Sequence, residues 1–193
     1  MTHLWHDLSP GTKPPSDIRA IVEIPGGSRN KYELDKESGV LRLDRVLYSA
    51  VHYPADYGFI PGTLAEDDDP LDVLVLLKEP TFAGCEVDLR PLGVLKLRDR
   101  GVPDNKILGV PLHDPLQTEY RKLEDVPGHL LAEIQHFFQT YKDLEGKRVE
   151  VVGWRSRQVA LKEITGSIAR YAEKYGKGKA RAVIAPAPKK PGG

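Results

Sequence analysis

The run Asp67-Asp68-Asp69-Pro70-Leu71-Asp72 places four carboxylates directly before the apolar stretch 73–77. Two carboxylates about 5 Å apart repel each other by roughly 3 kcal/mol at an effective dielectric constant of ~20, and three crowded together by roughly 10 kcal/mol. A fold tolerates such a cluster when a cation is normally bound to it, and an oxygen-only donor set suits Mg²⁺, Mn²⁺ or Ca²⁺. For an isolated run the alternative is a solvated turn, because Asp and Pro are both common turn residues.

A second acidic segment, 98–106, follows a long strand-like stretch and contains Asp99, Asp104 and Lys106. Taken alone, it is equally well explained as a polar loop. If two adjacent strands each deliver aspartates at their C-terminal ends, however, the loops converge, and opposing acidic loops are what a multi-metal site requires. An EF-hand is excluded, because Asp72 occupies the position of the required glycine when the first run is counted from its first residue.

A site that holds several Mg²⁺ ions usually acts on a phosphorylated substrate, because Mg²⁺ keeps part of its coordination shell for phosphate oxygens and water. The chain offers cationic and phenolic side chains that match such a substrate: Lys31, Arg45, Lys106, Lys142, Tyr53, Tyr57 and Tyr141. Each has a simpler explanation, since an alternating Lys-x-Glu is usually a solvated strand face and a tyrosine on an apolar helix stripe is usually core. The sequence contains no Walker-type phosphate loop.

The composition is that of an ordinary folded domain. The chain has 193 residues, of which 40% are hydrophobic and 29% charged, which excludes an intrinsically disordered protein. No stretch approaches the ~18 apolar residues of a membrane span, and the first residues lack the basic-then-apolar order of a secretory signal. The single cysteine, Cys85, permits no internal disulfide, which favours a reducing, cytoplasmic location.

The formal net charge of zero hides an asymmetry. Five basic and no acidic residues lie in 177–193, so residues 1–176 carry 23 basic and 28 acidic groups. An acidic body does not suit a nucleic-acid-binding protein, which carries a broad basic face. We predict one domain over 1–176, with 1–16 as an arm over its surface, followed by a basic tail over 177–193. That tail is expected to be a disordered, solubilising end, with a contact to another subunit or a polyanion as the alternative.

Alternation and turn residues predict the strands that must position these side chains. A short strand covers 21–24, and a hairpin covers 31–35 and 40–43 with a turn at 37–39. Further strands are expected at 73–77, 86–98, 107–110 and 148–153. Many short strands punctuated by Gly and Pro favour a small closed barrel over an open sheet.

Two helices are predicted from apolar residues that recur at helical spacing. The first stripe consists of Leu130, Ile134, Phe137 and Tyr141. The second consists of Ala160, Ile164, Ile168 and Tyr171, with Ser156 as a candidate N-cap and Gly176 at the end. Strands first and helices last indicate an α+β fold.

Together these segments resemble the soluble (family I) inorganic pyrophosphatases over roughly residues 16–172. Residues 67–73 fit the D-x-D-P-x-D-x motif of that family. Six further segments agree in type and order: Val22-Glu23-Ile24-Pro25, Lys31-Tyr32-Glu33-Leu34-Asp35, Asp44-Arg45, Tyr53-Pro54-x-x-Tyr57-Gly58, Asp99-x₄-Asp104-x-Lys106 and His136-Phe137-Phe138-x-x-Tyr141-Lys142. The short length resembles the bacterial form of the family.

The resemblance implies a fold and an activity. The fold would be a five-stranded, OB-like closed β-barrel with the two C-terminal helices packed outside it. The activity would be hydrolysis of inorganic pyrophosphate to two phosphates by direct attack of a metal-bridged water. Several Mg²⁺ ions per site would serve as cofactors, with Mn²⁺ as a substitute. The protein would form a homo-oligomer, with a hexamer favoured, and would bind neither nucleic acid nor membranes.

The resemblance also implies residue roles. Asp69 would be the general base, and Asp68 would be a spacer outside the chemistry. The residues that would hold or position metal ions are Asp67, Asp72, Asp99, Asp104, Glu23 and Glu33. The residues that would bind phosphate oxygens are Lys31, Arg45, Tyr57, Lys106, Tyr141 and Lys142. Of these, Lys31, Arg45 and Tyr57 would also act in catalysis, and Tyr53 would support the site.

Arg100 departs from the family pattern, because many members carry a second carboxylate beside the residue that corresponds to Asp99. An arginine there would weaken a metal ion at that end of the site or contact phosphate itself. With Asp99, Asp104 and Lys106 present, we expect activity to persist.

Two other functions compete with pyrophosphate hydrolysis. One is hydrolysis of a different phosphoanhydride, such as a nucleotide. The other is non-catalytic binding of nucleic acid by an OB-type barrel, which would require a basic groove lined by aromatic side chains.

Overall fold

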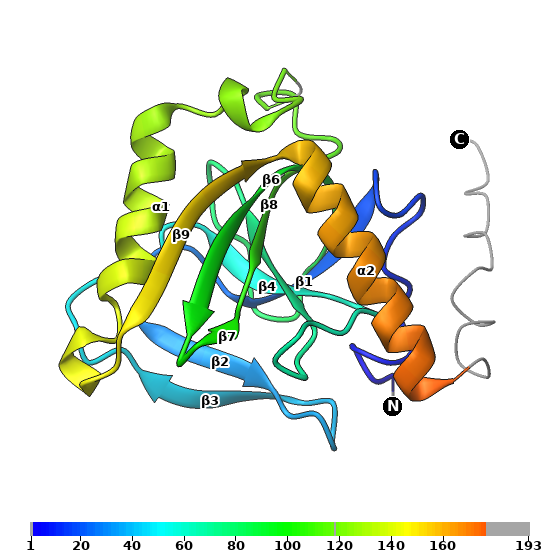
Figure 1. The fold of residues 1–193 in the computed structure, drawn as a ribbon, viewed down its shortest axis with the longest axis horizontal. Coiled ribbons are helices and arrows are strands. Elements are labelled where there is room, and N and C mark those ends of the chain that lie inside the picture. The colour runs from blue at the N-terminus through cyan, green and yellow to red at the C-terminus, as the bar shows by residue number, and fades with distance from the viewer. Residues whose placement is uncertain (1, 118, 177–193) are drawn as a thin grey trace.

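The computed structural model describes residues 2–117 and 119–176 (Figure 1), so the basic tail 177–193 lies outside the described residues. The strands are β1 Ile18–Ile24, β2 Asn30–Leu34, β3 Leu41–Val46, β4 Asp56–Ile60, β5 Leu71–Val75, β6 Glu86–Asp99, β7 Val102–Pro103, β8 Lys106–Pro111 and β9 Val149–Ser156. The helices are α1 Gly128–Thr140 and α2 Arg157–Tyr175, with 3₁₀ turns η1 Leu123–Asp125 and η2 Asp143–Glu145. The predicted α+β order is confirmed, with β9 inserted between the two helices.

The strands form a seven-stranded mixed sheet and a separate hairpin of β2 and β3. In the sheet the order is β1-β4-β5-β8-β6-β7, and β9 is added to β6. The long strand β6 also pairs with β1, from Ile18 opposite Leu89 to Ile21 opposite Glu86. Strand pairing therefore runs from β1 through β4, β5, β8 and β6 and back to β1. Strands β5 and β8 are parallel to each other, whereas the other pairs are antiparallel.

Strand β4 is absent from the predicted strands, because Gly58 and the nearby prolines interrupt the apolar alternation. In the structure Gly58 lies opposite Val22 of β1. A Cβ atom at position 58 would come within 1.9 Å of the backbone oxygen of Ile21. Glycine is required there because two strands approach closely, so the residue that indicated a break belongs to the sheet.

Strands β5 and β8 are buried on both faces, which explains their continuous apolar sequences. Leu74 and Leu108 join a core cluster that contains the α1 residues Ile134, Phe137 and Phe138. Val73, Val75 and Ile107 join a second cluster that contains Ala160 and Ile164 of α2. The sheet thus lies between two apolar layers, each completed by one helix.

The two predicted helices are confirmed, together with most of their buried stripes. Ile134, Phe137 and Tyr141 are buried on the α1 side, and Ala160, Ile164 and Tyr171 on the α2 side. Helix α1 packs against β9, and α2 packs against β6 (Figure 1). Ser156 occupies the N-cap position of α2 with extended backbone angles, but its side chain makes no capping hydrogen bond. Within the described residues, no helix has the length and apolar character needed to cross a membrane.

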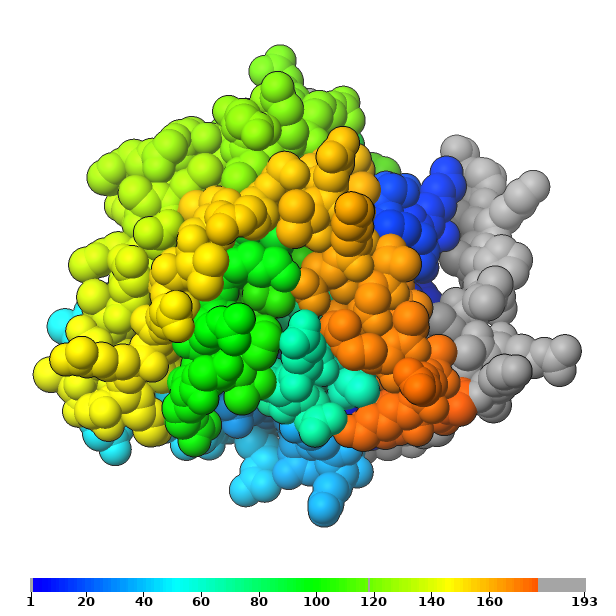
Figure 2. All heavy atoms as spheres, in the orientation of Figure 1, coloured from blue at the N-terminus to red at the C-terminus, as the bar shows by residue number. Residues whose placement is uncertain are grey.

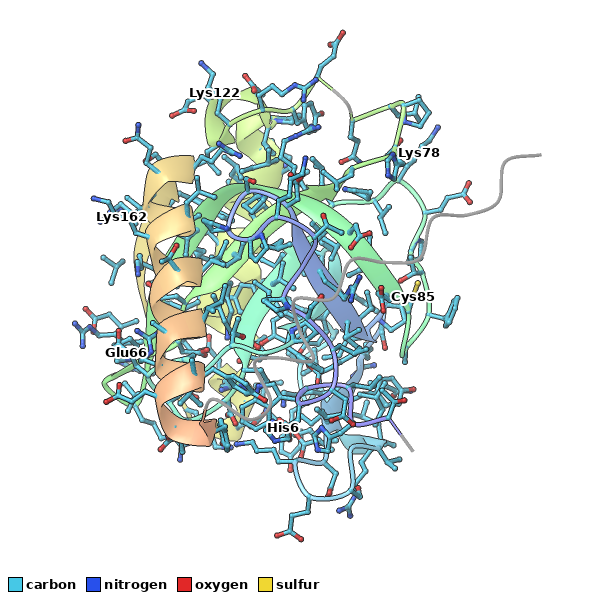
Figure 3. The ribbon with its side chains drawn as sticks, turned by 90° about the vertical axis from the view of Figure 1, so that its right-hand side faces the viewer. His6, Glu66, Lys78, Cys85, Lys122 and Lys162 are labelled. Carbon is cyan, nitrogen blue, oxygen red and sulfur yellow. The ribbon has the colours of Figure 1, made fainter. Side chains whose placement is uncertain are left out.

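The N-terminal segment is anchored by a buried tryptophan. Trp5 is 1% exposed, and its indole N–H donates to the backbone oxygen of Thr63 over 2.7 Å. His6 stacks on Trp5 and lies 2.7 Å, Nδ1 to hydroxyl oxygen, from Tyr171 of α2. Figure 3 shows His6 beside the C-terminal end of that helix. The segment before β1 therefore contacts both the last helix and the residues that lead into β5.

Candidate active site

A cavity of about 690 Å³ lies where β5 and β8 begin and β6 ends. Its wall contains every residue for which a metal, catalytic or phosphate role is predicted: Glu23, Lys31, Glu33, Arg45, Tyr57, Asp67, Asp69, Asp72, Asp99, Asp104, Lys106, Tyr141 and Lys142. Tyr53 lies behind this wall, buried, with its ring centroid 5.4 Å from that of Tyr57. The fold therefore gathers predicted site residues from segments far apart in the chain.

The directions of three strands explain how the acidic segments meet. Asp72 is the second residue of β5 and Asp99 is the last residue of β6. The expectation that both segments follow the C-terminal ends of strands is wrong for the first one, which precedes β5. Because β5 is parallel to β8 and β8 is antiparallel to β6, the start of β5 and the end of β6 lie at the same edge of the sheet.

Lys106 is the cation shared by the two acidic segments. Parallel pairing puts Asp72 opposite Lys106, and the Lys106 ammonium forms ion pairs with the carboxylates of both Asp72 and Asp104. The Lys106 side chain is 3% exposed. Burial alone would lower its pKa, but the charges of Asp104 and Asp72 raise the pKa overall. The lysine therefore remains positively charged.

The carboxylates around this lysine differ in their electrostatics. Burial raises the pKa of Asp72, although Lys106 opposes the shift. Burial opposes ionisation of Asp104 as well, but the charge and hydrogen bond of Lys106, together with Asp72 and Lys142, lower its pKa overall. Burial and the charge of Asp104 raise the pKa of Asp67, and burial and the charge of Asp72 raise the pKa of Glu23 to about 8. The raised pKa values of Glu23, Asp67 and Asp72 reflect burial that the nearby positive charges do not fully offset.

The end of β6 contributes Asp99, whose Oδ2 atom accepts a hydrogen bond from the Lys142 ammonium over 2.7 Å. Its Oδ1 atom is buried and lacks a hydrogen-bond partner among the described residues, with the Arg100 guanidinium 3.9 Å away. Arg100 has a φ of 51°, in the left-handed region, and its side chain is 79% exposed. The residue that departs from the family pattern thus stands at the rim of the cavity.

Cations also face the cavity from the β2–β3 hairpin. Lys31 forms an ion pair with Glu33. Nε of Arg45 donates to Oε1 of Glu145 over 3.0 Å, and the other carboxylate oxygen of Glu145 accepts from the Lys147 ammonium over 2.9 Å. The Glu145 side chain is 5% exposed, so one buried carboxylate orients two cations of the wall.

The predicted general base, Asp69, is half exposed and forms an ion pair with Lys36 of the hairpin turn. Its backbone N–H donates to Oδ1 of Asp67 over 3.1 Å. Between them, Asp68 adopts a φ of 69°. The Asp68 side chain is 75% exposed and pairs with Lys174 of α2 over 2.6 Å. This left-handed residue turns its own carboxylate outward, whereas its two neighbours line the cavity.

Three residues near the site are missing from the predicted set. Lys36 and Lys147 line the cavity, and Glu145 holds Arg45. Lys36 directly follows the Lys31–Asp35 segment, and this proximity could have identified it. Glu145 and Lys147 lie in a polar stretch after α1 that has no periodic pattern, so only the folded position of the hairpin reveals them.

The wall carries equal numbers of acidic and basic side chains. The acids are Glu23, Glu33, Asp67, Asp69, Asp72, Asp99 and Asp104, and the bases are Lys31, Lys36, Arg45, Arg100, Lys106, Lys142 and Lys147. Across residues 2–117 and 119–176, no three acidic, histidine or cysteine side chains form a ready-made metal cluster. Lysine side chains lie between the acids instead, as Lys106 does between Asp72 and Asp104.

The donor set nevertheless fits Mg²⁺. Every acidic side chain of the wall offers carboxylate oxygens, which are the ligand atoms that Mg²⁺ prefers. Two features mark positions where an added cation would be favourable: a buried oxygen of Asp99 without a hydrogen-bond partner in residues 2–117 and 119–176, and the raised pKa values of Asp67 and Asp72. A polyphosphate entering a charge-balanced cavity would require such cations.

A family model described as inorganic pyrophosphatase matches residues 20–172. The chain belongs to the inorganic pyrophosphatase family. An inorganic pyrophosphatase of Geobacillus stearothermophilus is 53% identical over 156 residues, covering 81% of this chain and 94% of the relative. One from Haloferax volcanii is 47% identical over 176 residues, covering 91% and 99%.

Solved structures of the same family have the same fold. The crystal structure of inorganic pyrophosphatase from Thermus thermophilus superposes with a TM-score of 0.84 at 47% identity. That match covers 88% of this chain and 99% of the Thermus protein. Family membership therefore extends over both acidic segments, the hairpin and most of α2.

Proposed function

We propose that this chain hydrolyses inorganic pyrophosphate to two phosphates, with Mg²⁺ as its metal and Asp69 as the general base. Membership in the inorganic pyrophosphatase family supports the reaction. The observation that carries the proposal is the cavity wall, where seven carboxylates and seven cationic side chains face one space. Such a wall suits a highly charged anion that arrives together with metal cations.

Cationic and phenolic side chains would bind and orient the diphosphate. Arg45 can point its guanidinium at phosphate oxygens because Glu145 fixes its Nε atom. Lys31 and Lys142 both line the cavity, and burial raises the pKa of Tyr57, which keeps that phenol a neutral donor. Charges placed in advance around the phosphoryl groups lower the barrier to phosphoryl transfer.

The reaction itself needs one water molecule and no covalent intermediate. The water oxygen forms a bond to one phosphorus while the bond from that phosphorus to the bridging oxygen breaks. Asp69 takes a proton from the attacking water, and its half-exposed position gives water access to the carboxylate. The bridging oxygen leaves with the second phosphate, and Arg45 and Lys142 stabilise the negative charge that develops there.

Asp67, Asp72, Asp99 and Asp104 would hold the Mg²⁺ ions, and Glu23 and Glu33 would position the ions or their waters. When bound, Mg²⁺ supplies Lewis-acid charge that polarises phosphoryl oxygens and lowers the pKa of water. Lys106 would keep Asp72 and Asp104 together while the metal is absent.

Three finer points belong to the same proposal. The ring of pairings β1-β4-β5-β8-β6 supports a five-stranded, OB-like closed barrel with both helices outside, within one domain over residues 1–176. We infer a homo-oligomer, with a hexamer favoured, from the likeness to short bacterial members. A cytoplasmic location is consistent with the single cysteine.

The test is phosphate release from pyrophosphate, measured with Mg²⁺ and with EDTA. We expect turnover that requires the metal and falls at least about 100-fold in Asp72→Asn, with the circular dichroism spectrum unchanged. Asp68→Asn is the matched control, because that carboxylate faces outward and should leave turnover near wild type. Normal turnover in Asp72→Asn would contradict the proposal. Faster cleavage of ATP than of pyrophosphate, or a salt-sensitive gel shift with nucleic acid, would favour one of the competing functions.

A further inference from the structure

We propose that Glu163 and Arg170 of α2 are positioning residues that set the spacing between the two acidic segments of the cavity. The inference rests on the proposed function, in which those segments hold Mg²⁺. Neither residue lines the cavity. Each instead binds a segment of chain that carries cavity-lining residues: Glu163 binds the segment of Asp104 and Lys106, and Arg170 binds the segment that leads to Asp67.

Glu163 holds the second acidic segment through Asn105. Asp104 and Lys106 line the cavity, and because side chains alternate along an extended chain, Asn105 between them points away from it. Asn105 is 7% exposed, and its Nδ2 atom donates to Oε2 of Glu163 over 3.2 Å. A buried amide left without this acceptor would be costly, so Glu163 fixes the segment between two site residues.

Arg170 holds the first acidic segment through Leu64, three residues before Asp67. The Nε atom of Arg170 donates to the backbone oxygen of Leu64 over 2.9 Å. The backbone N–H of Leu64 donates to the carbonyl oxygen of Ser167 over 2.9 Å. Both backbone groups of this buried leucine are therefore bound to α2. In Figure 2 the teal atoms of the segment before β5 lie between the green atoms of the β6–β7 end and the orange α2.

The two attachment points are also joined to each other. Nη2 of Arg170 lies 3.4 Å from Oε1 of Glu163 and donates to the Ser167 hydroxyl over 2.8 Å. Glu163 pairs in addition with Lys96 of β6. Seven helical residues span about 10 Å with little freedom. Helix α2 therefore acts as a spacer of constant length between the segment that leads to Asp67 and the segment of Asp104 and Lys106.

A spacer of this kind should act on metal affinity, because partners that orient ligands typically change affinity 10–100-fold when removed. The experiment is calorimetric titration of MgCl₂ into the substrate-free full chain. We expect Glu163→Met, which removes the acceptor of the Asn105 amide at similar side-chain size, and Arg170→Gln to weaken Mg²⁺ binding about tenfold. The Mg²⁺ concentration for half-maximal phosphate release should rise by a similar factor, and saturating Mg²⁺ should restore kcat.

Two controls separate positioning from general stability. Lys162→Gln changes the residue next to Glu163, but its side chain points into solvent (Figure 3) and its variant should bind Mg²⁺ like wild type. Ile168→Val removes one methylene group from the packing of α2 on the core and leaves the hydrogen-bonding groups of Glu163 and Arg170 unchanged. That variant should have a lowered Tm and unchanged Mg²⁺ affinity.

Wild-type Mg²⁺ affinity in both Glu163→Met and Arg170→Gln would overturn the inference. Weakening in Ile168→Val equal to that in Arg170→Gln, at a matched fall in Tm, would overturn it as well, because Mg²⁺ binding would then follow stability alone. Absence of Mg²⁺ binding in the wild-type protein would instead contradict the proposed function, and with it this inference.

Discussion

The carboxyl group of Glu23 accepts a hydrogen bond from the backbone N–H of Leu34 over 2.7 Å, which ties the β2–β3 hairpin to β1. Glu23 is 7% exposed, and burial raises its pKa to about 8. In the metal-free protein it is therefore mostly a neutral acid at pH 7. A cation bound nearby would favour the ionised form, so metal binding and release of this proton should be linked.

The pKa of Glu23 predicts how the stability of the metal-free protein depends on pH. Below about 4.5 the group is neutral in both the folded and the unfolded chain. Between about 4.5 and about 8 the unfolded chain ionises first, so the free energy of unfolding should fall by up to ~1.4 kcal/mol per pH unit and level off above pH 8. Urea unfolding in EDTA at several pH values measures this. Glu23→Gln should flatten the slope, and an equal flattening in the exposed control Glu37→Gln would contradict the assignment.

Removal of Lys106 should cost the metal-free protein about 3–5 kcal/mol of stability, because two partly buried carboxylates lose the buried cation that they share. Lys106→Met keeps a long apolar side chain and therefore isolates the charge. Chemical unfolding of the variant in EDTA and in Mg²⁺ measures the effect, and Mg²⁺ should recover part of the loss. Lys78→Met, at an exposed position (Figure 3), is the control. A loss below about 1 kcal/mol in Lys106→Met would show that the pair is not the buried cluster described above.

Arg45→Lys should raise KM for pyrophosphate about tenfold, although the charge is kept. A lysine lacks the Nε atom that Glu145 fixes, and one charge-assisted hydrogen bond contributes about 1.5–3 kcal/mol. Steady-state kinetics at saturating Mg²⁺ measures it. Arg42→Lys makes the same change on the same strand, at a side chain that is 70% exposed, and should leave KM unchanged. An unchanged KM in Arg45→Lys would remove Arg45 from substrate binding.

Arg100→Glu should strengthen Mg²⁺ binding at the Asp99 end of the cavity by up to about tenfold. The change replaces a positive by a negative charge near a carboxylate oxygen that has no hydrogen-bond partner among the described residues. The Mg²⁺ isotherm and the Mg²⁺ dependence of phosphate release both report it. Arg98→Glu, one strand residue before Asp99 and outside the cavity wall, controls for net charge. Identical isotherms for both variants would mean that Arg100 has no specific influence on the metal.

The acidic site could be predicted from sequence because its chemistry is concentrated in short runs. Asp67–Asp72 and Asp99–Lys106 each adjoin a strand, and both do line one cavity. The relative directions of β5 and β6 could not be predicted, because a parallel pair with β8 decides which strand ends share an edge. The role of Glu145 could not be predicted for a similar reason, because its partner Arg45 lies 100 residues away in the sequence.

Prediction of the fold from the sequence is limited in the same way. Long periodic stripes predicted α1 and α2, whereas β4 depends on Gly58, whose need for glycine arises from the approach of β1. The burial of Trp5 was also not predicted, because its partners Thr63 and Tyr171 are distant in sequence. Contacts of this kind are properties of the assembled chain and leave no local pattern.

The aromatic contact between His6 and Tyr171 joins residues 165 positions apart. During synthesis on the ribosome, Trp5 and His6 emerge long before their partners on α2. The segment 61–69, which contacts both Trp5 and α2, can reach its final position only after α2 has been synthesised. Nascent chains that stop before α2 should therefore contain the strands of the sheet and yet lack a finished carboxylate site.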